Sequence, residues 1–403
     1  MFRSILFLIL IVNVFAEDDR VVVLDVGGVR GEKFWNGDFF EFYGVPYATA
    51  PKGRDRYKAP LPVEPWEGIM DAKIRNIGCP QVYLTEEDDD HLILDGIEDC
   101  LTMNLFVPEI ASENNPVPVL VYIHSGAYSG GSGNMARFHY LARHDVIVIS
   151  FNYRLGFIGF AFNTAKNLAI SMGYNNTEKI EDLNEFLLNT SMEDLAAKSK
   201  NFYFPNATFG LAPCVENVNG NTEPVITESP LITFHKGDYK KIPVLTGFSN
   251  MEGISRTIKF SEWSDRMNEN FADFLPADLV FDSDKSRDAF INDIKKHYFK
   301  GEEVTHDTLQ EYVDYFSDSM FKYGIMKSAR LHSLKSRRPV YLYEFTYVGK
   351  LNFKHYYMDK IKGASHRDQT AYLLDFFEFT TKATDMDTRD RMTAMWTDFV
   401  KYE

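Results

Sequence analysis

Residues 145–156 read DVIVISFNYRLG, and this stretch decides the fold class. It opens with a short apolar run that ends at an asparagine and is followed by a glycine. Three other runs have the same character, at residues 116–123 (PVPVLVYI), 241–248 (KIPVLTGF) and 339–347 (PVYLYEFTY). Runs of this length that are apolar on both faces are typical of strands in a parallel or mixed sheet that is covered by helices.

Helical patterns lie between and after these runs, at residues 164–172, 180–188, 287–299, 308–334 and 387–400. Glycine turns join further predicted strands near the start of the chain, at residues 21–31 and 39–51. Strands that alternate with helices predict an α/β fold. Because no Gly/Ser-rich or Pro-rich linker separates them, residues 17–403 are expected to form one domain with embedded helical insertions.

The charge of the chain limits its partners. The 403 residues carry a formal net charge of −15, with 58 acidic and 43 basic side chains. Nucleic acids and anionic membranes are recognised by clustered Lys and Arg, so this balance argues against both as partners. It favours neutral or cationic small molecules.

The first sixteen residues, MFRSILFLILIVNVFA, predict a signal peptide. Arg3 supplies the charged start, residues 5–15 form an apolar run too short to span a bilayer, and small residues precede a cleavage site before Glu17. No later stretch is long and apolar enough to cross a membrane. The mature protein is therefore expected to be secreted and extracellular.

Export permits disulfides and glycosylation. Cys79 and Cys100 bracket an acidic loop, and a bridge between them would stabilise the fold by about 3 kcal/mol. Cys214 is then left over, either as a free buried thiol or as a cysteine that has lost its partner. Three sequons predict glycosylation, at Asn175, Asn189 and Asn206.

Several separated motifs resemble the type-B carboxylesterases, the family that includes cholinesterases and insect juvenile-hormone and antennal esterases. They are FYGVPYA at residues 42–48, EDCLTMN at residues 98–104, NYRLG at residues 152–156, and Trp396 with Phe399. Thr102 stands where an aromatic residue is usual. The resemblance runs from about Val21 to the last residue, and it implies an α/β-hydrolase fold and serine-esterase chemistry.

Ester hydrolysis by this chemistry needs a nucleophile, a base, an acid that orients the base, and backbone donors for an oxyanion. The resemblance assigns the acid to Glu252, in GFSNMEG at residues 247–253, and the base to His366, in GASHRD at residues 363–368. Both follow predicted strands, and the order acid then base is the one that this fold uses.

The resemblance also assigns the oxyanion donors. HSGAY at residues 124–128 follows a predicted strand, where the family has a glycine-rich loop, so Gly126 and Ala127 are expected to supply N–H groups. Ser125 and Ala127 stand where glycine is usual, and side chains at these positions restrict the backbone.

The nucleophile is absent. Its strand-to-helix elbow needs the pattern G-x-S-x-G, and no serine of the chain has it; Ser132, Ser249, Ser255 and Ser365 each have only the first glycine. NTAKNLA at residues 163–169 resembles a helix that comes well after the elbow in the family. We therefore predict that the nucleophile strand and elbow are deleted at a join near residues 161–162.

The chain also ends soon after the Trp396 motif, so we expect it to be shorter than the family at its C-terminus. A strand missing from the middle of a sheet would leave its two neighbours unpaired, at about 1–3 kcal/mol for each buried polar group. The chain is therefore predicted to be destabilised.

The sequence thus predicts a carboxylesterase-family protein without serine-dependent turnover, whose intact form would hydrolyse a small neutral ester. Two alternatives follow from the missing serine: a cholinesterase-like adhesion protein, or a carrier with an apolar pocket built from the 33 Phe and 22 Tyr. No cofactor or metal is expected, because the histidines lack ligand spacings such as H-E-x-x-H.

Overall fold

The computed structural model describes residues 19–403, except for residue 36 and the segments 85–91, 161–164, 176–178, 204–205, 207, 209, 217–223, 354–356, 358 and 377–382. The predicted signal peptide at residues 1–16 and the predicted join near residues 161–162 lie outside the described residues.

The strands include all four of the apolar runs that predict the sheet, although most begin a few residues later than the runs do. Their bounds are β1 Asp19–Leu24, β2 Gly27–Lys33, β3 Phe39–Pro46, β4 Ile69–Asp71, β5 Gln81–Leu84, β6 Leu92–Asp95, β7 Thr102–Pro108, β8 Val119–Ile123, β9 Ile147–Phe151, β10 Val244–Ser249 and β11 Val340–Phe345. Prolines directly precede β8, β10 and β11, and they delay the start of these strands because proline has no N–H to donate to a ladder.

The strands form a seven-stranded sheet, in the order β1-β2-β3-β7-β9-β8 with β4 beside β2, and two small sheets, β10-β11 and β5-β6. The large sheet is mixed. From β1 to β9 its neighbours on that path are antiparallel, because short connections join the first strands, whereas β8 is parallel to β9 and β4 to β2. The strands β10 and β11 are also parallel, but no described strand joins them to the large sheet.

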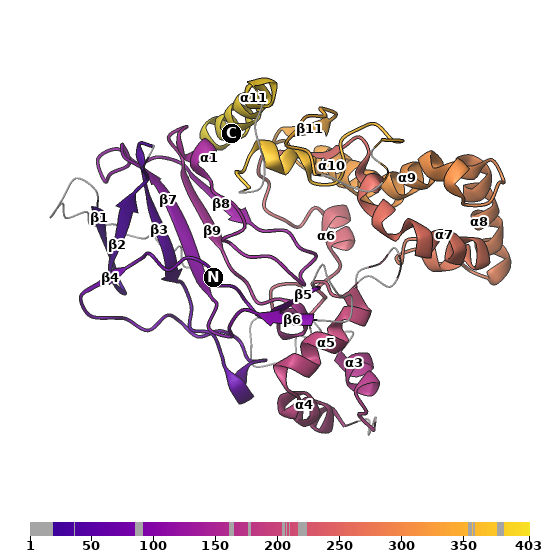
Figure 1. Ribbon diagram of the computed structural model, residues 1–403, viewed down its shortest axis with the longest axis horizontal. Helices are drawn as coiled ribbons and strands as arrows, with labels where there is room; N and C mark the ends of the chain where they lie inside the picture. The colour runs from indigo at the N-terminus through magenta and orange to yellow at the C-terminus, as the bar shows by residue number, and fades with distance from the viewer. Residues whose placement is uncertain are drawn as a thin grey trace.

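The helices lie around these sheets. Their bounds are α1 His139–Ala142, α2 Gly156–Gly159, α3 Ala165–Ser171, α4 Ile180–Asn189, α5 Met192–Tyr203, α6 Pro230–Lys236, α7 Phe260–Glu269, α8 Asp284–Phe299, α9 Leu309–Ser317, α10 Tyr323–Lys335 and α11 Ala383–Tyr402. Figure 1 shows the large sheet on one side of the molecule, α3, α4 and α5 below it, and α7, α8 and α9 as a group at the far end.

Two details of the helices differ from the prediction. The predicted single helix is divided into α9 and α10 by a π-helical turn, Asp318–Lys322. The prediction also missed α7, whose Trp263 packs with Phe274 and Phe316 in a buried aromatic cluster. The apolar residues of α7, Phe260, Trp263 and Met267, recur at helical spacing and are buried, so the pattern was present in the sequence.

The C-terminal helix α11 ties the two halves of the chain together. Its Trp396 packs against a core cluster that includes Phe138 and Val148 of the large-sheet half, and also against Tyr343 of β11. The backbones of Arg137 and Asp375 add a pair of hydrogen bonds between the halves, at 2.9 and 3.0 Å. α11 therefore lies beside α1, as Figure 1 shows.

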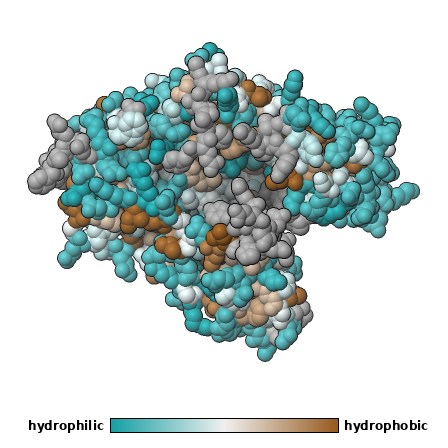
Figure 2. Space-filling view, in the orientation of Figure 1, coloured by the Kyte–Doolittle hydropathy of each residue, from teal (hydrophilic) through white to brown (hydrophobic). Residues whose placement is uncertain are grey.

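The strand β8 ends the large sheet, and its outer face is uncovered. Val119, Val121 and Ile123 are 49, 54 and 65% exposed, whereas the strand beside it, β9, alternates buried and half-buried residues. Figure 2 shows hydrophobic patches from the lower left of the molecule to its lower middle, while the surface over α7 and α8 is mostly hydrophilic. An apolar strand at an open sheet edge is unusual in a folded domain.

Candidate functional site: an acid–base pair and an oxyanion loop

The predicted acid and base are in contact. Glu252 begins a 3-10 helix just after β10, and His366 lies in the loop that follows β11, 114 residues further along the chain. The imidazole Nδ1 lies 2.7 Å from Glu252 Oε2, while Glu252 Oε1 accepts a hydrogen bond from the Ser249 N–H at 2.8 Å. Glu252 is only 3% exposed, so both of its oxygens are held away from solvent by these partners.

The two loops are also joined through their backbones. The N–H of Met251 donates to the Ala364 carbonyl at 2.9 Å, and the Ala364 N–H donates to Asn250 Oδ1 at 2.8 Å. Because β10 and β11 pair in parallel, their carboxyl ends lie at the same edge of the small sheet. The positions of Glu252 and His366 therefore follow from the pairing of two strands that the chain does encode.

Asp368 anchors the loop that carries His366. It is fully buried, and its carboxylate accepts hydrogen bonds from the N–H groups of Phe353 and Ser365 and from the Asn352 amide, at 2.6 to 2.8 Å. Burial raises the pKa of Asp368 to about 6, although these hydrogen bonds oppose the shift. The residue is the last of the GASHRD motif, but the sequence gives no sign that it anchors the loop.

An aromatic ring covers the base. The Phe321 ring lies 4.5 Å from the His366 ring, and it comes from the π-helical turn between α9 and α10. π-helical turns are rare in proteins, and those that occur often lie at functional sites. No sequence signal marks the turn, so the contact with His366 could not be predicted.

The predicted oxyanion loop follows β8. Gly126, Ala127 and Tyr128 all have positive φ angles, of 130°, 52° and 60°. A Cβ atom at Gly126 would lie 1.9 Å from the Gly130 carbonyl oxygen, so only glycine fits there. Ala127 adopts the left-handed conformation that glycine adopts without cost, which explains why glycine is usual at its position.

His124 fixes the start of this loop. Its ring stacks on Tyr153 with centroids 4.2 Å apart, and the Tyr153 hydroxyl donates to the His124 carbonyl at 2.7 Å. Burial lowers the pKa of His124, and the positive charge of Arg367 lowers it further. Arg367 also lowers the pKa of Tyr122, which burial raises, so the base loop and the end of β8 lie within electrostatic reach of each other.

Comparisons with known proteins identify the family. The model of the carboxylesterase family matches residues 18–167 and, separately, residues 161–403. The chain belongs to the carboxylesterase family. Among its relatives, esterase FE4 of Myzus persicae is 26% identical over 96% of this chain and 85% of the relative, and a juvenile hormone esterase of Tribolium castaneum is 24% identical over 90 and 80%.

A solved structure agrees with the fold. Juvenile hormone esterase from Manduca sexta, with OTFP covalently attached, superimposes with a TM-score of 0.81 and covers 96% of this chain and 90% of that chain. At 22% identity this similarity concerns the fold alone, and it confirms the predicted α/β-hydrolase class with a mixed sheet flanked by helices.

The G-x-S-x-G pattern is absent from the sequence of this carboxylesterase-family chain. In the described chain, no serine hydroxyl hydrogen-bonds to the His366 imidazole. The nearby Ser249 donates its hydroxyl to Gln369 at 2.9 Å, and Ser365 Oγ is buried without a partner.

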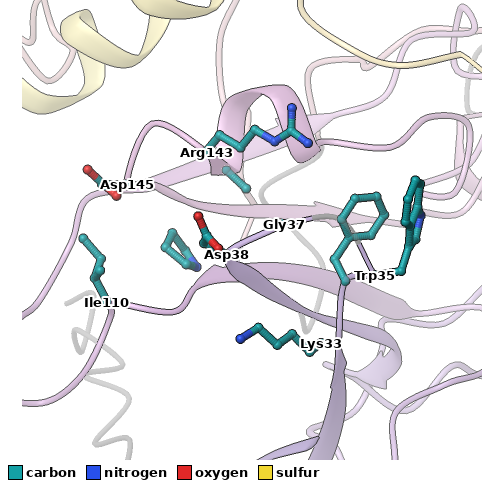
Figure 3. A pocket seen from close by; sticks show the side chains of 10 residues that line it. Lys33, Trp35, Gly37, Asp38, Ile110, Arg143 and Asp145 are labelled. Carbon is teal, nitrogen blue, oxygen red and sulfur yellow. The ribbon is translucent and has the colours of Figure 1, made fainter. Parts of the chain in front are cut away.

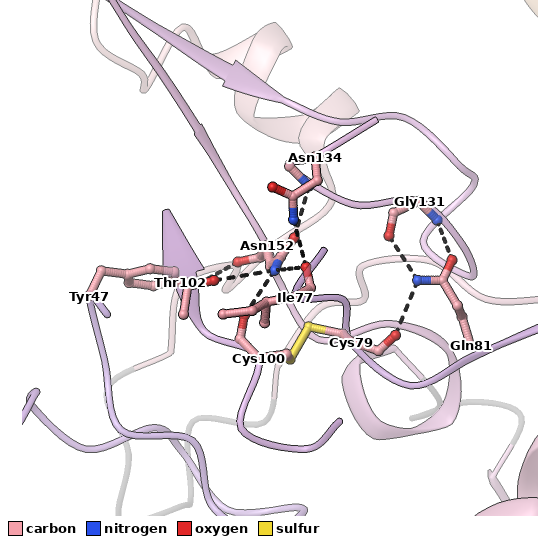
Figure 4. Close-up of a disulfide and its surroundings, with 10 residues drawn as sticks. Tyr47, Ile77, Cys79, Gln81, Cys100, Thr102, Gly131, Asn134 and Asn152 are labelled. Carbon is pink, nitrogen blue, oxygen red and sulfur yellow. Dashed lines mark hydrogen bonds between the residues drawn. A yellow bond between two sulfur atoms is a disulfide. The ribbon is translucent and has the colours of Figure 1, made fainter. Parts of the chain in front are cut away.

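The predicted disulfide supports the loop that follows the oxyanion residues. Cys79 and Cys100 are bonded, with their Cα atoms 5.0 Å apart. Beside this bond, the Gln81 amide accepts from the Gly131 N–H at 2.7 Å and donates to the Gly131 carbonyl at 3.1 Å (Figure 4). The cystine and Gln81 thus anchor the glycine-rich loop at its far end.

A cavity of about 870 Å³ lies away from this site (Figure 3). It is lined by residues such as Lys33, Trp35, Asp38 and Arg143, which lie at the end of the large sheet where β8 and β9 begin. The predicted acid, base and oxyanion residues follow the carboxyl ends of their strands, where α/β proteins place their sites. The cavity therefore contains none of the predicted site residues.

The remaining predicted residues lie elsewhere. Asn175 and Asn189 are exposed and Asn206 is half-buried. Cys214 is free, as one of the two expectations has it, but it is half-buried and not buried.

Two further observations concern metals and membranes. Within the described ranges, no group of three or more His, Cys, Asp or Glu side chains could hold a metal ion. A search of the same ranges finds no helix with the length and hydropathy of a membrane span.

Proposed function

We propose that this chain is a carboxylesterase scaffold whose acid, base and oxyanion loop are formed but which does not hydrolyse esters through a serine. The observation that carries the proposal is the 2.7 Å contact between His366 and Glu252 in a sequence without G-x-S-x-G. In the intact family form, the substrate would be a small neutral carboxylic ester.

The chemistry explains why one missing residue is decisive. In serine-dependent hydrolysis the serine oxygen attacks the ester carbonyl, while the imidazole takes the serine proton and later returns it to the leaving alcohol. Glu252 would orient His366 through Nδ1, and the N–H groups of Gly126 and Ala127 would stabilise the oxyanion. Without the attacking oxygen no acyl-enzyme forms, although the groups that would assist it remain.

Two findings support a deletion near residues 161–162. The family model matches the chain in two parts that meet at residues 161–167. The alignment with esterase FE4 has 484 positions, so at least 81 of them lie opposite gaps in this chain of 403 residues. Gaps of that total length leave room for a strand, an elbow and the helices on either side.

The free sides of β8 and β10 support the same interpretation. Each strand pairs with one described neighbour only, β8 with β9 and β10 with β11. A strand placed between β8 and β10 would join the two sheets into one and bring its carboxyl end to the edge that carries His366 and the oxyanion loop.

The chain as it stands is expected to unfold at a lower temperature than its intact relatives.

An organophosphate probe tests the proposal. The purified chain is incubated with a fluorophosphonate and its intact mass is measured, with an active insect carboxylesterase as the positive control. We expect no mass increase for this chain and one adduct on the control. An adduct that maps to a serine of this chain, and that is lost in His366→Ala, would contradict the proposal.

We also propose that the protein is secreted and glycosylated. The leader-like first sixteen residues, the cystine and the exposed sequons at Asn175 and Asn189 support this. Expression in insect cells should place the chain in the medium, with a mass that falls after peptide N-glycosidase treatment. Retention of an unglycosylated chain inside the cells would contradict it.

A further inference from the structure

We propose that the His366 imidazole is itself an acyl acceptor in this chain: its Nε2 takes an acyl group directly from an activated donor, such as an aryl ester, and water then releases the acid. The inference rests on the proposed function, because an imidazole that takes the proton of a serine is not itself the nucleophile. It adds an activity for the acid–base pair and names the class of substrate.

The Glu252 carboxylate fixes the tautomer of the imidazole. His366 Nδ1 lies 2.7 Å from Glu252 Oε2, and Glu252 is only 3% exposed. A carboxylate only accepts hydrogen bonds, so Nδ1 carries the hydrogen and Nε2 carries the lone pair. The same carboxylate stabilises the positive charge that an imidazole gains when Nε2 forms a new bond. His366 therefore has a free lone pair and a fixed counter-charge.

The Nε2 edge of the ring is open. The His366 side chain is 35% exposed, and its Nε2 has no hydrogen-bond partner within the part of the chain that the structure describes. Phe321 covers one face of the ring, with the two centroids 4.5 Å apart. Glu252 and Phe321 thus hold the ring by one edge and one face, and they leave the lone pair of Nε2 accessible from solvent.

Other described histidines lack this combination. Only two of them form an ion pair with a carboxylate within the described ranges: His366, and His139, whose Nδ1 lies 3.8 Å from Asp375. His139 is buried, so an acyl donor cannot reach it. His235 and His297 are exposed, but neither has a carboxylate partner in the described chain. They are therefore matched controls for exposure without the counter-charge.

The reaction balances without a co-reactant. Nε2 forms a bond to the acyl carbon, and the bond from that carbon to the leaving phenolate breaks. The Nδ1 proton then passes through solvent to the phenolate, which leaves a neutral acylimidazole. Water adds to the acyl carbon, the carbon–nitrogen bond breaks, and one proton of the water returns the imidazole to its neutral form. The sum is ester and water to carboxylic acid and phenol.

The leaving group sets the substrate class. When an imidazole adds to an alkyl ester, the imidazole is expelled again in preference to the alkoxide, because the alkoxide is much the stronger base. No acyl-enzyme therefore forms from the small neutral esters of the intact family form. A phenolate with electron-withdrawing groups is a far weaker base and leaves readily. The substrates are thus activated acyl donors, namely aryl esters of this kind and pyrocarbonates.

Diethyl pyrocarbonate tests the nucleophile within one molecule. It transfers an ethoxycarbonyl group to imidazole, and the product survives digestion at neutral pH, so mass spectrometry can map each histidine. We expect His366 to be labelled at least about tenfold faster than the more exposed His235 and His297, because loss of the orienting carboxylate costs far more than that in catalytic triads. Glu252→Gln should remove this difference. Labelling of His366 no faster than the two controls would overturn the proposal.

The release of nitrophenol from p-nitrophenyl acetate tests turnover. The purified chain should release it continuously, and His366→Ala should lower the rate at least about tenfold. His297→Ala should leave the rate unchanged. Thermal melts will show whether the variants are folded, and the labelling of the unmodified chain needs no variant. An unchanged rate in folded His366→Ala would contradict the proposal.

These measurements are separate from the test of the proposed function. A phosphonyl group on an imidazole nitrogen is lost in acid, so the fluorophosphonate mass, measured in acid, reports on serine alone. An adduct on a serine would overturn the proposed function and, with it, the free imidazole. No serine adduct together with slow labelling of His366 would overturn this inference only.

Discussion

The two sides of the candidate site differ in how many of their polar groups are hydrogen-bonded and in how much of their apolar surface is buried. On the acid–base side, Glu252, His366 and Asp368 are held by hydrogen bonds of 2.6 to 2.8 Å from neighbouring loops. On the other side, β8 exposes three apolar side chains, and no described strand pairs with its outer edge. The difference shows that the contact of Glu252 with His366 depends on the pairing of β10 with β11 and not on a strand beside the outer edge of β8.

The largest effect is expected on the oxyanion side. Gly126→Ala should lower the free energy of unfolding by about 3 kcal/mol or more, because its φ is 130° and the new Cβ would overlap the Gly130 carbonyl. Gly156→Ala is the matched control, since its φ is 57° but the added Cβ meets open space, and it should cost only about 1 kcal/mol. Urea unfolding measures both, and equal costs would show that the loop is not tightly packed.

The next effect tests the acid–base side through pH. The pKa of Asp368 is raised to about 6 in the folded chain, above an unfolded value near 3.9. Ionisation is therefore harder in the folded state, and stability should fall, relative to Asp368→Asn, as pH rises from about 4 to about 6. The expected change is on the order of 2 kcal/mol. A constant difference between the two proteins across this range would contradict the raised pKa.

A third effect tests how α9 supports Glu252. Ser317 is buried and its Oγ accepts the Gly253 N–H at 2.8 Å, next to Glu252. Ser317→Ala should destabilise the chain by about 1–3 kcal/mol, because a buried N–H loses its partner. Ser333→Ala is the control, since its hydroxyl also bonds within the helix but is exposed, and it should change stability by less than about 0.5 kcal/mol.

The smallest effect should be a gain. Ala127→Gly removes the cost of a left-handed alanine, roughly 1–2 kcal/mol. It also increases the conformational entropy of the unfolded chain, which lowers stability by about 0.4–1 kcal/mol. We expect a net stabilisation of about 1 kcal/mol or less. Ala142→Gly in α1, where the backbone is helical, should instead destabilise. Destabilisation by Ala127→Gly would show that this loop is not strained.

The sequence predicted the strand cores because runs such as VLVYI and IVISF are apolar on both faces, a pattern that few other elements share. It also predicted the pairing of Cys79 with Cys100, because the two cysteines bracket an acidic loop, and the contact of Glu252 with His366, which the resemblance to the family implies.

It could not predict contacts that depend on three-dimensional packing. Phe321 reaches His366 through a π-helical turn, and Asp368 anchors a loop through backbone N–H groups whose positions only the folded chain defines. The division of the parallel strands into two sheets was likewise hidden, because a pattern of residues does not state which strands become neighbours.

The most direct test of the proposal adds the strand, elbow and helices that we propose to be missing. The strand, elbow and flanking helices of an intact relative, such as esterase FE4, are inserted at residues 161–162, and hydrolysis of a small neutral ester is measured. The account predicts turnover that falls by at least about 10³-fold in His366→Ala. A graft that melts cooperatively but neither hydrolyses the ester nor reacts with an organophosphate would contradict it.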